Sequence, residues 1–293
     1  MPISFEQKPG LVVYLTAGDP DLATTREMAI AAIDNGADVI ELGVPFSDPL
    51  ADGPVIQRAS ERAVARGTRL SDVLELCTDI RRLRPKAGIL LFSYLNPVVR
   101  MGMAEFTKAA KASGADGVLL TDMIVEEATE YLACMRENGL APVFLAAPTS
   151  PDERLKAIAE NSQGFVYAIS RVGITGTQTS LADDAKTLVD RLRAFTELPI
   201  ALGFGVSTPE HVRTVGEFAE AAVVGSAIVG LIEKTPPAEA PKAVGEFVRS
   251  LCGGGDSSAK LTQELADMHS PAGIDGEVEA GSVAGEVPAG AKG

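Results

Sequence analysis

The stretch VIELGVPFSDPLADGPVIQ, residues 39–57, decides the fold that this sequence predicts. Its first residues are apolar apart from Glu41, which is typical of a parallel strand covered on both faces. A carboxylate inside such a strand costs free energy unless the fold uses it. Prolines then interrupt regular structure, and the resulting loop carries Asp48 and Asp52. The stretch therefore predicts a buried and a loop carboxylate at the carboxyl end of a strand, where parallel α/β proteins hold their catalytic groups.

Each of these carboxylates also has a structural interpretation. A single Glu in a strand often pairs with a neighbour in a barrel layer, and an Asp before Gly-Pro often forms a turn. Together, around one long proline-rich loop, they favour acid–base chemistry. The sequence holds two histidines, His211 and His269, both far from Glu41 along the chain. We therefore expect neither a histidine-based triad nor a metal site, and we assign proton transfer to carboxylates.

Apolar runs alternate with amphipathic stretches along most of the chain. The pattern predicts eight strands, at residues 11–15, 37–44, 88–94, 117–122, 142–147, 164–170, 199–203 and 221–224. Eight strands that alternate with helices are typical of an α/β protein with a (β/α)8 TIM barrel of roughly 250 residues, and we predict one such catalytic domain over residues 1–252. An open doubly wound sheet is the alternative. The Gly-x-Gly-x-x-Gly fingerprint that would favour it does not follow the first strand.

Local signals between these strands predict helices and turns. Asn96-Pro97 is expected to close the third strand as a turn. A single helix is expected over residues 125–138, ended by Gly139.

The composition changes at residue 253. Residues 256–293 hold seven acidic residues and two lysines, a net charge of 2 − 7 = −5, and no aromatic residue. Such a segment buries too little apolar surface to offset the entropy lost on ordering. We therefore predict a disordered tail over residues 253–293, outside the barrel domain.

The whole chain carries a net charge of −14, with 40 acidic and 26 basic residues. This balance argues against nucleic acid or an anionic membrane as the main partner. No apolar run reaches the roughly 20 residues of a membrane span, and no signal-peptide pattern opens the chain. The three cysteines have no metal-binding spacing. Together these features predict a reduced, cytoplasmic setting.

Glycine-bearing turns follow the late predicted strands. They contain Gly173 and Gly176, then Gly203 and Gly205, then Gly225 with Ser226. A single turn of this kind is more often structural, but glycine lets a backbone approach an anion closely, and a helix N-terminus favours negative charge. Because barrels often bind phosphate after strands seven and eight, we predict a phosphate site built from neutral donors.

Residues 41–54, ELGVPFSDPLADGP, resemble the signature of the tryptophan synthase alpha chain family. Matching segments elsewhere are YLTxGDP at residues 14–20, SRxGxTG at 170–176, GFG at 203–205 and Gly225-Ser226. The resemblance implies a lyase of tryptophan biosynthesis that cleaves indole-3-glycerol phosphate into indole and glyceraldehyde 3-phosphate. It implies a retro-aldol reaction with no cofactor in this chain.

The resemblance also implies roles for individual residues. Glu41 would be the catalytic acid–base group, and its burial would raise its pKa towards neutrality. Asp52 would accept from the indole N–H and stabilise the positive charge that develops on the ring. Substrate would be bound by Tyr14, Ile56, Tyr167, Thr175, Gly176, Phe204, Gly205, Gly225 and Ser226. Phe92 would join the indole pocket, although it fits the barrel core equally well.

A partner is implied by the same resemblance. The carboxyl-end face, with Asp48, Pro49 and Asn96, would bind a tryptophan synthase beta chain that carries pyridoxal phosphate, in an alpha2-beta2 tetramer. Two positions depart from the family. Met123-Ile124 stands where a proline is common, which bears on docking, and Tyr14 stands where phenylalanine is common, so its hydroxyl needs a partner.

Other functions fit a barrel with phosphate turns. A sugar-phosphate isomerase or another barrel of the indole pathway is one class, and a non-catalytic regulatory barrel is another. Isomerases of this shape usually use a His or Lys near the reacting carbonyl, and the loop between Glu41 and Asp52 has neither. The presence of both carboxylates argues against a barrel that only binds a partner.

Overall fold

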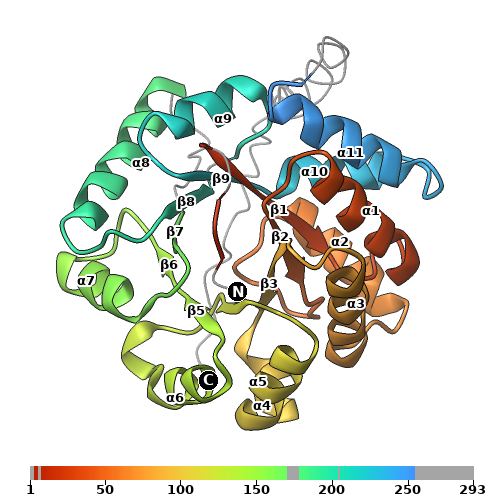
Figure 1. The fold of residues 1–293 in the computed structure, drawn as a ribbon, viewed down its shortest axis with the longest axis horizontal. Coiled ribbons are helices and arrows are strands. Elements are labelled where there is room, and N and C mark those ends of the chain that lie inside the picture. The colour runs from red at the N-terminus through yellow and green to blue at the C-terminus, as the bar shows by residue number, and fades with distance from the viewer. Residues whose placement is uncertain (1–2, 6–7, 170–177, 204, 255–293) are drawn as a thin grey trace, which may run out of the picture.

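A ring of parallel strands surrounded by helices forms the protein (Figure 1). The computed structural model describes residues 3–5, 8–169, 178–203 and 205–254. The predicted tail from residue 255 on lies outside the described residues, as do Thr175, Gly176 and Phe204. The strands are β1 Gly10–Thr16, β2 Val39–Gly43, β3 Gly88–Ser93, β4 Gly117–Leu120, β5 Ala141–Val143, β6 Leu145–Ala146, β7 Val166–Ile169, β8 Ile200–Gly203 and β9 Ala221–Val224.

The sheet closes through a single predicted strand. Its order is β5-β4-β3-β2-β1-β9-β8-β7-β6, and each paired ladder is parallel. The two ends of this order, β5 and β6, are separated in sequence by Phe144 alone, whose carbonyl accepts from the N–H of Tyr167 at 3.2 Å. The predicted strand at 142–147 is therefore one strand whose halves pair with different neighbours. Counted in this way the barrel has eight strands, and the predicted TIM barrel is confirmed.

Helices cover the outside of the ring (Figure 1). They are α1 Leu22–Asp34, α2 Pro54–Ala65, α3 Leu70–Leu83, α4 Leu95–Met101, α5 Met103–Ala112, the 3-10 turn η1 Val125–Glu127, α6 Thr129–Asn138, α7 Asp152–Asn161, α8 Gln178–Arg193, α9 Pro209–Gly216, α10 Ser226–Lys234 and α11 Ala240–Leu251.

Two local predictions are wrong. Asn96-Pro97 lies inside α4 and is not a turn. Proline is tolerated there because the N–H groups in the first turn of a helix have no carbonyl partner within the helix, so none is lost. The first of these N–H groups, that of Leu95, donates instead to the carboxylate of Asp122 at 2.7 Å. The helix expected over 125–138 divides into η1 and α6 at Ala128.

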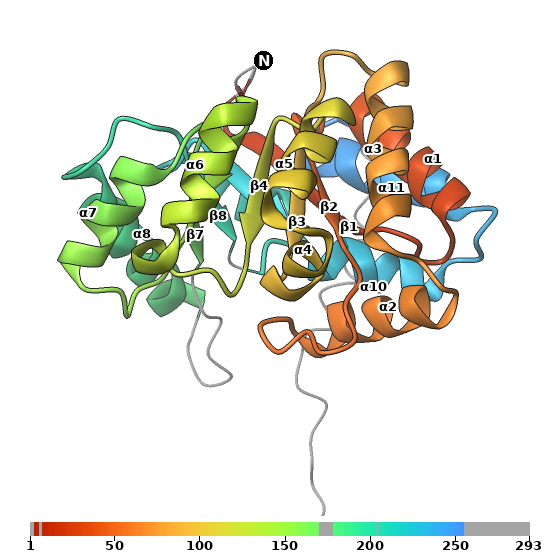
Figure 2. The same cartoon turned by 90° about the horizontal axis from the view of Figure 1, so that it is seen from below.

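The interior of the barrel is filled from its N-terminal end. Val39 belongs to the inner cluster of apolar side chains, whereas Ile40 and Leu42 of the same strand pack outward against the helices. Ile3 and Phe5 belong to the inner cluster too, and the ring of Phe5 lies 5.9 Å from that of Phe165. The open end is thus the carboxyl end of the strands. The loop after β2 leads there into α2, which Figure 2 shows beside α10 at one end of the molecule.

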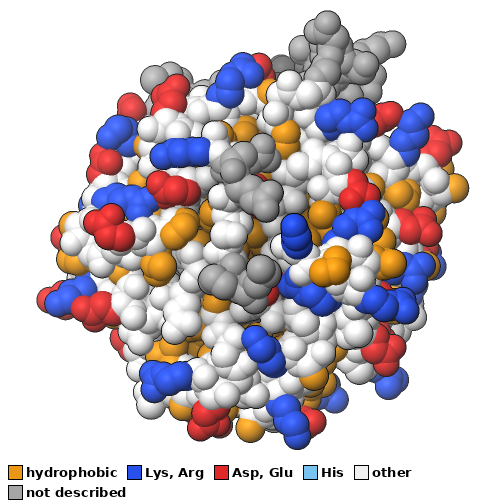
Figure 3. Space-filling view, viewed as in Figure 1, with side chains coloured by type: hydrophobic (Ala, Val, Ile, Leu, Met, Phe, Trp, Pro, Cys, Tyr) orange, Lys and Arg blue, Asp and Glu red, His pale blue; other side chains and the backbone are white. Residues whose placement is uncertain are grey.

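Charged side chains of both signs are interspersed around the helical rim (Figure 3). On this face the described residues form no broad basic patch of the kind that binds nucleic acid. Within the described ranges, no helix is long and apolar enough to cross a membrane.

Candidate active site

Glu41 points into the barrel because it lies two residues after Val39, an inner-cluster residue of the same strand. It is fully buried, and among the described residues neither carboxylate oxygen has a hydrogen-bond partner. Burial, and secondarily the charge of Asp52, raises the pKa of Glu41 to about 8. A carboxyl group in this environment is neutral at pH 7 and can donate a proton.

Tyr14 covers the space above Glu41. The two residues are paired in the β1–β2 register, and the Tyr14 ring leans over the next inward position, Gly43. A Cβ at Gly43 would lie 2.2 Å from the Tyr14 hydroxyl oxygen, so only glycine leaves room for the ring. The hydroxyl accepts from Thr16 Oγ1 at 3.3 Å, which gives it the partner that the sequence required. Phe92 meets the ring edge-on, with centroids 5.3 Å apart, and completes an aromatic wall.

Asp52 is held on its loop by a residue that the sequence did not single out. The hydroxyl of Tyr94 donates to Asp52 Oδ2 at 3.1 Å. Burial raises the pKa of Asp52 to about 6, and the Tyr94 hydrogen bond opposes that shift. The site therefore holds two carboxyl groups of separated pKa, one protonated and one mostly ionised at pH 7, which is the usual basis for dividing acid and base roles.

Glycine turns lie next to the aromatic wall. Gly225 is the N-cap of α10, and Ser226 is the first residue of that helix. A Cβ at Gly225 would stand 3.7 Å from Tyr14 Cβ and 3.8 Å from Ile56 Cδ1. The predicted phosphate turn and the predicted indole wall are thus neighbours.

Tyr167 reaches the same space from β7. Its ring lies close to Gly203 at the end of β8, where a Cβ would be 3.1 Å from Tyr167 Cε1. Burial raises the pKa of Tyr167 well above its usual value, and the charges of Glu41 and Asp52 raise it further. The last fact places Tyr167 within electrostatic reach of both carboxylates.

The structure therefore brings most of the predicted site residues to one end of the barrel. Gly205, with φ 66°, occurs two residues after β8. Asp48 and Asn96 are exposed, on the β2–α2 loop and on α4, and Pro49 is partly exposed beside Asp48. Among the described residues no group of three or more His, Cys, Asp and Glu side chains could hold a metal ion.

Comparison with known proteins identifies the family. A family model for the tryptophan synthase alpha chain matches residues 3–252. The chain belongs to the tryptophan synthase alpha chain family. It is thus a lyase of the tryptophan pathway, which decides against the isomerase and regulatory alternatives that the sequence left open.

Relatives within the tryptophan synthase alpha chain family are similar over most of their length. The alpha chain of Solibacter usitatus is 52% identical over 229 residues, which are 78% of this chain and 85% of that protein. The alpha chain of Cupriavidus pinatubonensis is 42% identical over 249 residues, 85% and 94% of the two chains. A crystal structure of the tryptophan synthase complex from Pyrococcus furiosus matches with a TM-score of 0.77 and 39% identity, covering 84% of this chain and 99% of that one.

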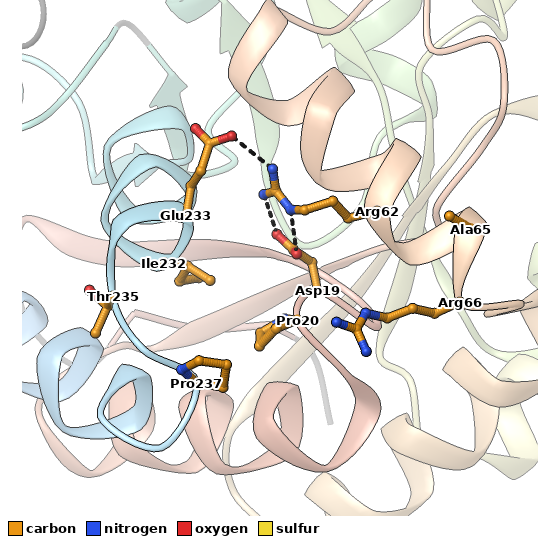
Figure 4. A pocket seen from close by; sticks show the side chains of 9 residues that line it. All are labelled: Asp19, Pro20, Arg62, Ala65, Arg66, Ile232, Glu233, Thr235 and Pro237. Atoms are coloured by element: carbon orange, nitrogen blue, oxygen red, sulfur yellow. Dashed lines mark hydrogen bonds and ion pairs between the residues drawn. The ribbon is translucent and has the colours of Figure 1, made fainter.

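An ion-pair network ties together α2 and α10, the two helices that border the site (Figure 4). Arg62 of α2 donates to both oxygens of the buried Asp19, at 2.9 and 2.7 Å, and to Glu233 of α10 at 2.8 Å. Arg58, one helical turn earlier, donates two further hydrogen bonds to Glu233. Together Arg58 and Arg62 lower the pKa of Glu233 to about 2. The network borders a hollow of about 440 Å³, but its charges satisfy one another. The network fixes α2, which follows Asp52, against α10, which begins at the predicted phosphate turn.

A first prediction concerns stability. The folded-state pKa of Glu41, about 8, is above its usual 4.5, so the folded protein binds the extra proton and loses stability as pH rises from 4.5 towards 8. Glu41→Gln removes this penalty. We expect the variant to be more stable than the wild type by up to about 3 kcal/mol at pH 7 and equally stable near pH 4, in urea unfolding measured at both pH values. A pH-independent difference would contradict an unpaired buried carboxyl group.

A second prediction concerns the phosphate turn. A methyl group at Gly225 would make ordinary van der Waals contacts with Tyr14 and Ile56, so the barrel has room for Gly225→Ala. Because Gly225 is the N-cap of α10, the added methyl crowds the helix N-terminus at which we predict that an anion binds. By calorimetry, glycerol 3-phosphate should bind about tenfold more weakly, and indole binding should fall by a smaller factor, because the methyl makes only ordinary contacts with Tyr14 and Ile56. Equal loss of both ligands would contradict a phosphate role for this turn.

Proposed function

We propose that this chain cleaves indole-3-glycerol phosphate into indole and glyceraldehyde 3-phosphate, as the alpha subunit of a tryptophan synthase. The observation that carries the proposal is the pair of carboxyl groups, Glu41 and Asp52, with separated pKa values at one end of an aromatic-lined barrel. Family membership supports the reaction, and the geometry supports the assignment of roles.

Glu41 acts as the acid–base group. Its carboxylic acid gives a proton to C3 of the indole ring, and the carboxylate then takes the proton of the glycerol hydroxyl next to that carbon. The bond between C3 and the glycerol chain breaks, its electron pair returns to the ring, and the hydroxyl carbon becomes an aldehyde. A buried group with a pKa near 8 suits both proton transfers at neutral pH.

Asp52 acts on the ring nitrogen. Its ionised carboxylate accepts from the indole N–H and stabilises the positive charge that the ring carries after protonation at C3. Electrostatic stabilisation of this kind is strong because the group is partly shielded from water. Tyr14, Ile56, Phe92 and Tyr167 supply the surrounding apolar contacts.

The phosphate of the substrate binds at the turn that begins α10. Gly225 and Ser226 present backbone N–H groups there, and Ser226 adds a hydroxyl donor. Gly205 contributes a second glycine turn. By similarity to the family, Thr175, Gly176 and Phe204 complete the contacts.

A beta chain binds over the same end of the barrel and holds the pyridoxal phosphate of the complete enzyme. A similar structure from Pyrococcus furiosus is described as an a2b2 complex, and we propose the same assembly, in the cytoplasm, for this chain. The proposed docking face includes Asp48, Pro49 and Asn96. Large apolar side chains are exposed there without apolar cover: Leu50 is 82% exposed, Val99 59% and Ile124 44%. A groove of about 670 Å³ between the β2–α2 loop and α4 offers a place for a partner segment.

The main test of this function is indole release. The chain mixed with its beta chain and indole-3-glycerol phosphate should release indole, and Glu41→Gln should reduce the turnover number by about 100-fold or more while substrate still binds. Stopped-flow fluorescence of indole measures the first result, and calorimetry the second. Unchanged turnover in Glu41→Gln would overturn its acid–base role, and no indole from the wild type would overturn the function.

A further prediction concerns the partner. The loop that carries Asp52 is largely exposed, and a displacement of roughly 1 Å at a catalytic group can cost about 100-fold in rate. The isolated chain should therefore cleave slowly, and the beta chain should accelerate it by favouring the productive loop position. Asp48→Ala should reduce this gain at least severalfold and leave the slow rate of the isolated chain nearly unchanged.

The matched control is Asp184→Ala, which removes an exposed aspartate from α8. It should be activated like the wild type when beta chain is titrated at fixed substrate. Normal activation of Asp48→Ala, or fast cleavage by the isolated wild type, would refute the gating account without touching the assignment of the reaction.

A further inference from the structure

Tyr94 links two parts of the site that are far apart in sequence. It follows β3 as the N-cap of α4, and it is 5% exposed. Its hydroxyl accepts the N–H of Ala51 at 2.9 Å and donates to Asp52 Oδ2 at 3.1 Å. One oxygen atom thus holds the backbone of one loop residue and the carboxylate of the next.

The ring of Tyr94 also contacts the start of the same loop. It packs against Phe46 with centroids 5.2 Å apart and planes tilted by 33°. Other loop contacts act on the backbone: Gln57 Nε2 donates to the carbonyl of Asp52 at 2.9 Å, and Phe46 N–H donates to Ser60 Oγ at 3.4 Å. Among the described residues, Tyr94 is the one side chain that bonds the carboxylate of Asp52.

We propose that Tyr94 is a positioning residue for the cleavage, which commits Oδ2 of Asp52 to its own hydroxyl and leaves Oδ1 as the acceptor for the ring N–H of the substrate. The proposal rests on the function proposed above. It follows from the geometry because a carboxylate whose one oxygen is fixed by a buried hydroxyl can rotate little, so its other oxygen has a defined direction. Tyr94 does not touch the reacting atoms, and it acts through Asp52.

The hydrogen bond has an electrostatic consequence that a purely structural contact would lack. It stabilises the ionised form of Asp52, so its removal raises the pKa of Asp52 above about 6. The titratable side chains that face Asp52 are Glu41 on β2, Tyr14 on β1, Tyr94 itself and Tyr167 on β7. The three tyrosines have pKa values raised above their usual 10 and stay neutral, so Glu41 is the group that titrates together with Asp52.

The test is Tyr94→Phe in the complex with the beta chain. The variant keeps the ring and its contact with Phe46 and loses only the hydroxyl. We expect kcat to fall about tenfold, KM to change less than about threefold, and the acidic limb of the kcat profile to move to higher pH, since Asp52 must be ionised. Direct observation of the Asp52 carboxyl by NMR titration should show the same upward movement.

Tyr131→Phe is the matched control. It removes another buried tyrosine hydroxyl, which joins α6 to β4 by donating to the carbonyl of Val118 at 2.8 Å and has no hydrogen bond to Asp52. It should lower the melting temperature about as much as Tyr94→Phe does, and it should keep the kcat and pH profile of the wild type. A second check uses the Asp52→Asn background, in which Tyr94→Phe should cause little further loss.

The outcomes separate this proposal from the function on which it rests. No indole from the wild-type complex contradicts the function itself. If the wild type is active and Tyr94→Phe has the kcat and pH profile of Tyr131→Phe, Tyr94 is structural and the proposal fails. A full additional loss in the Asp52→Asn background also overturns it, because Tyr94 would then act independently of Asp52.

Discussion

The enclosure of one carboxyl group, that of Glu41, is the constraint on which this end of the barrel depends. An ionised carboxylate in such a place would cost several kcal/mol, so the group stays protonated near pH 7. The buried carboxyl group is held in place because β2, the strand that carries it, is paired with β1 on one side and with β3 on the other. A neutral acid on a rigid strand is well suited to give and take one proton without moving. Stability is thus reduced at the residue that the proposed chemistry needs most.

Asp52, at the same end of the barrel, is mostly ionised at pH 7, whereas Glu41 is protonated. It belongs to a loop, and its carboxylate stays mostly ionised because it remains closer to solvent and receives a hydrogen bond. The two helices that flank the site are locked through Asp19, Arg62 and Glu233, so the loop has a firm frame on its C-terminal side. The site thus combines an acid–base group on a rigid strand, an ionised carboxylate on a loop, and two helices fixed to each other. The loop that carries Asp52 also carries Leu50, which is the most exposed large apolar side chain among the described residues.

Much of this could be predicted from the sequence, and the remainder could not for identifiable reasons. Apolar runs predicted the barrel strands because a parallel strand is buried on both faces, and Glu41 was conspicuous because it interrupts one of them. The division of one predicted strand into β5 and β6 at Phe144 could not be predicted, because the two halves form a single apolar run in the sequence. Asn96-Pro97 looked like a turn because proline ends helices, but it also fits their first turn. Tyr94 could have been noticed only as a polar aromatic residue at the end of a strand, and the Arg62–Glu233 pair spans 171 residues, beyond any local pattern.

The closure of the sheet has a consequence for how the chain reaches this structure. β1 pairs with β9, the first strand with the last, and β5 and β6 meet at Phe144 in the middle of the sequence. A chain that has been synthesised only as far as β5 is therefore a five-stranded sheet with two unpaired edges, and exposed edges invite pairing with other chains. Both edges stay unpaired until β6 to β9 have been synthesised. The pairing partner of β1 is β9, which lies more than 200 residues later in the chain. The finished barrel has no edge to protect, but during synthesis the whole first half depends on the second half for its protection.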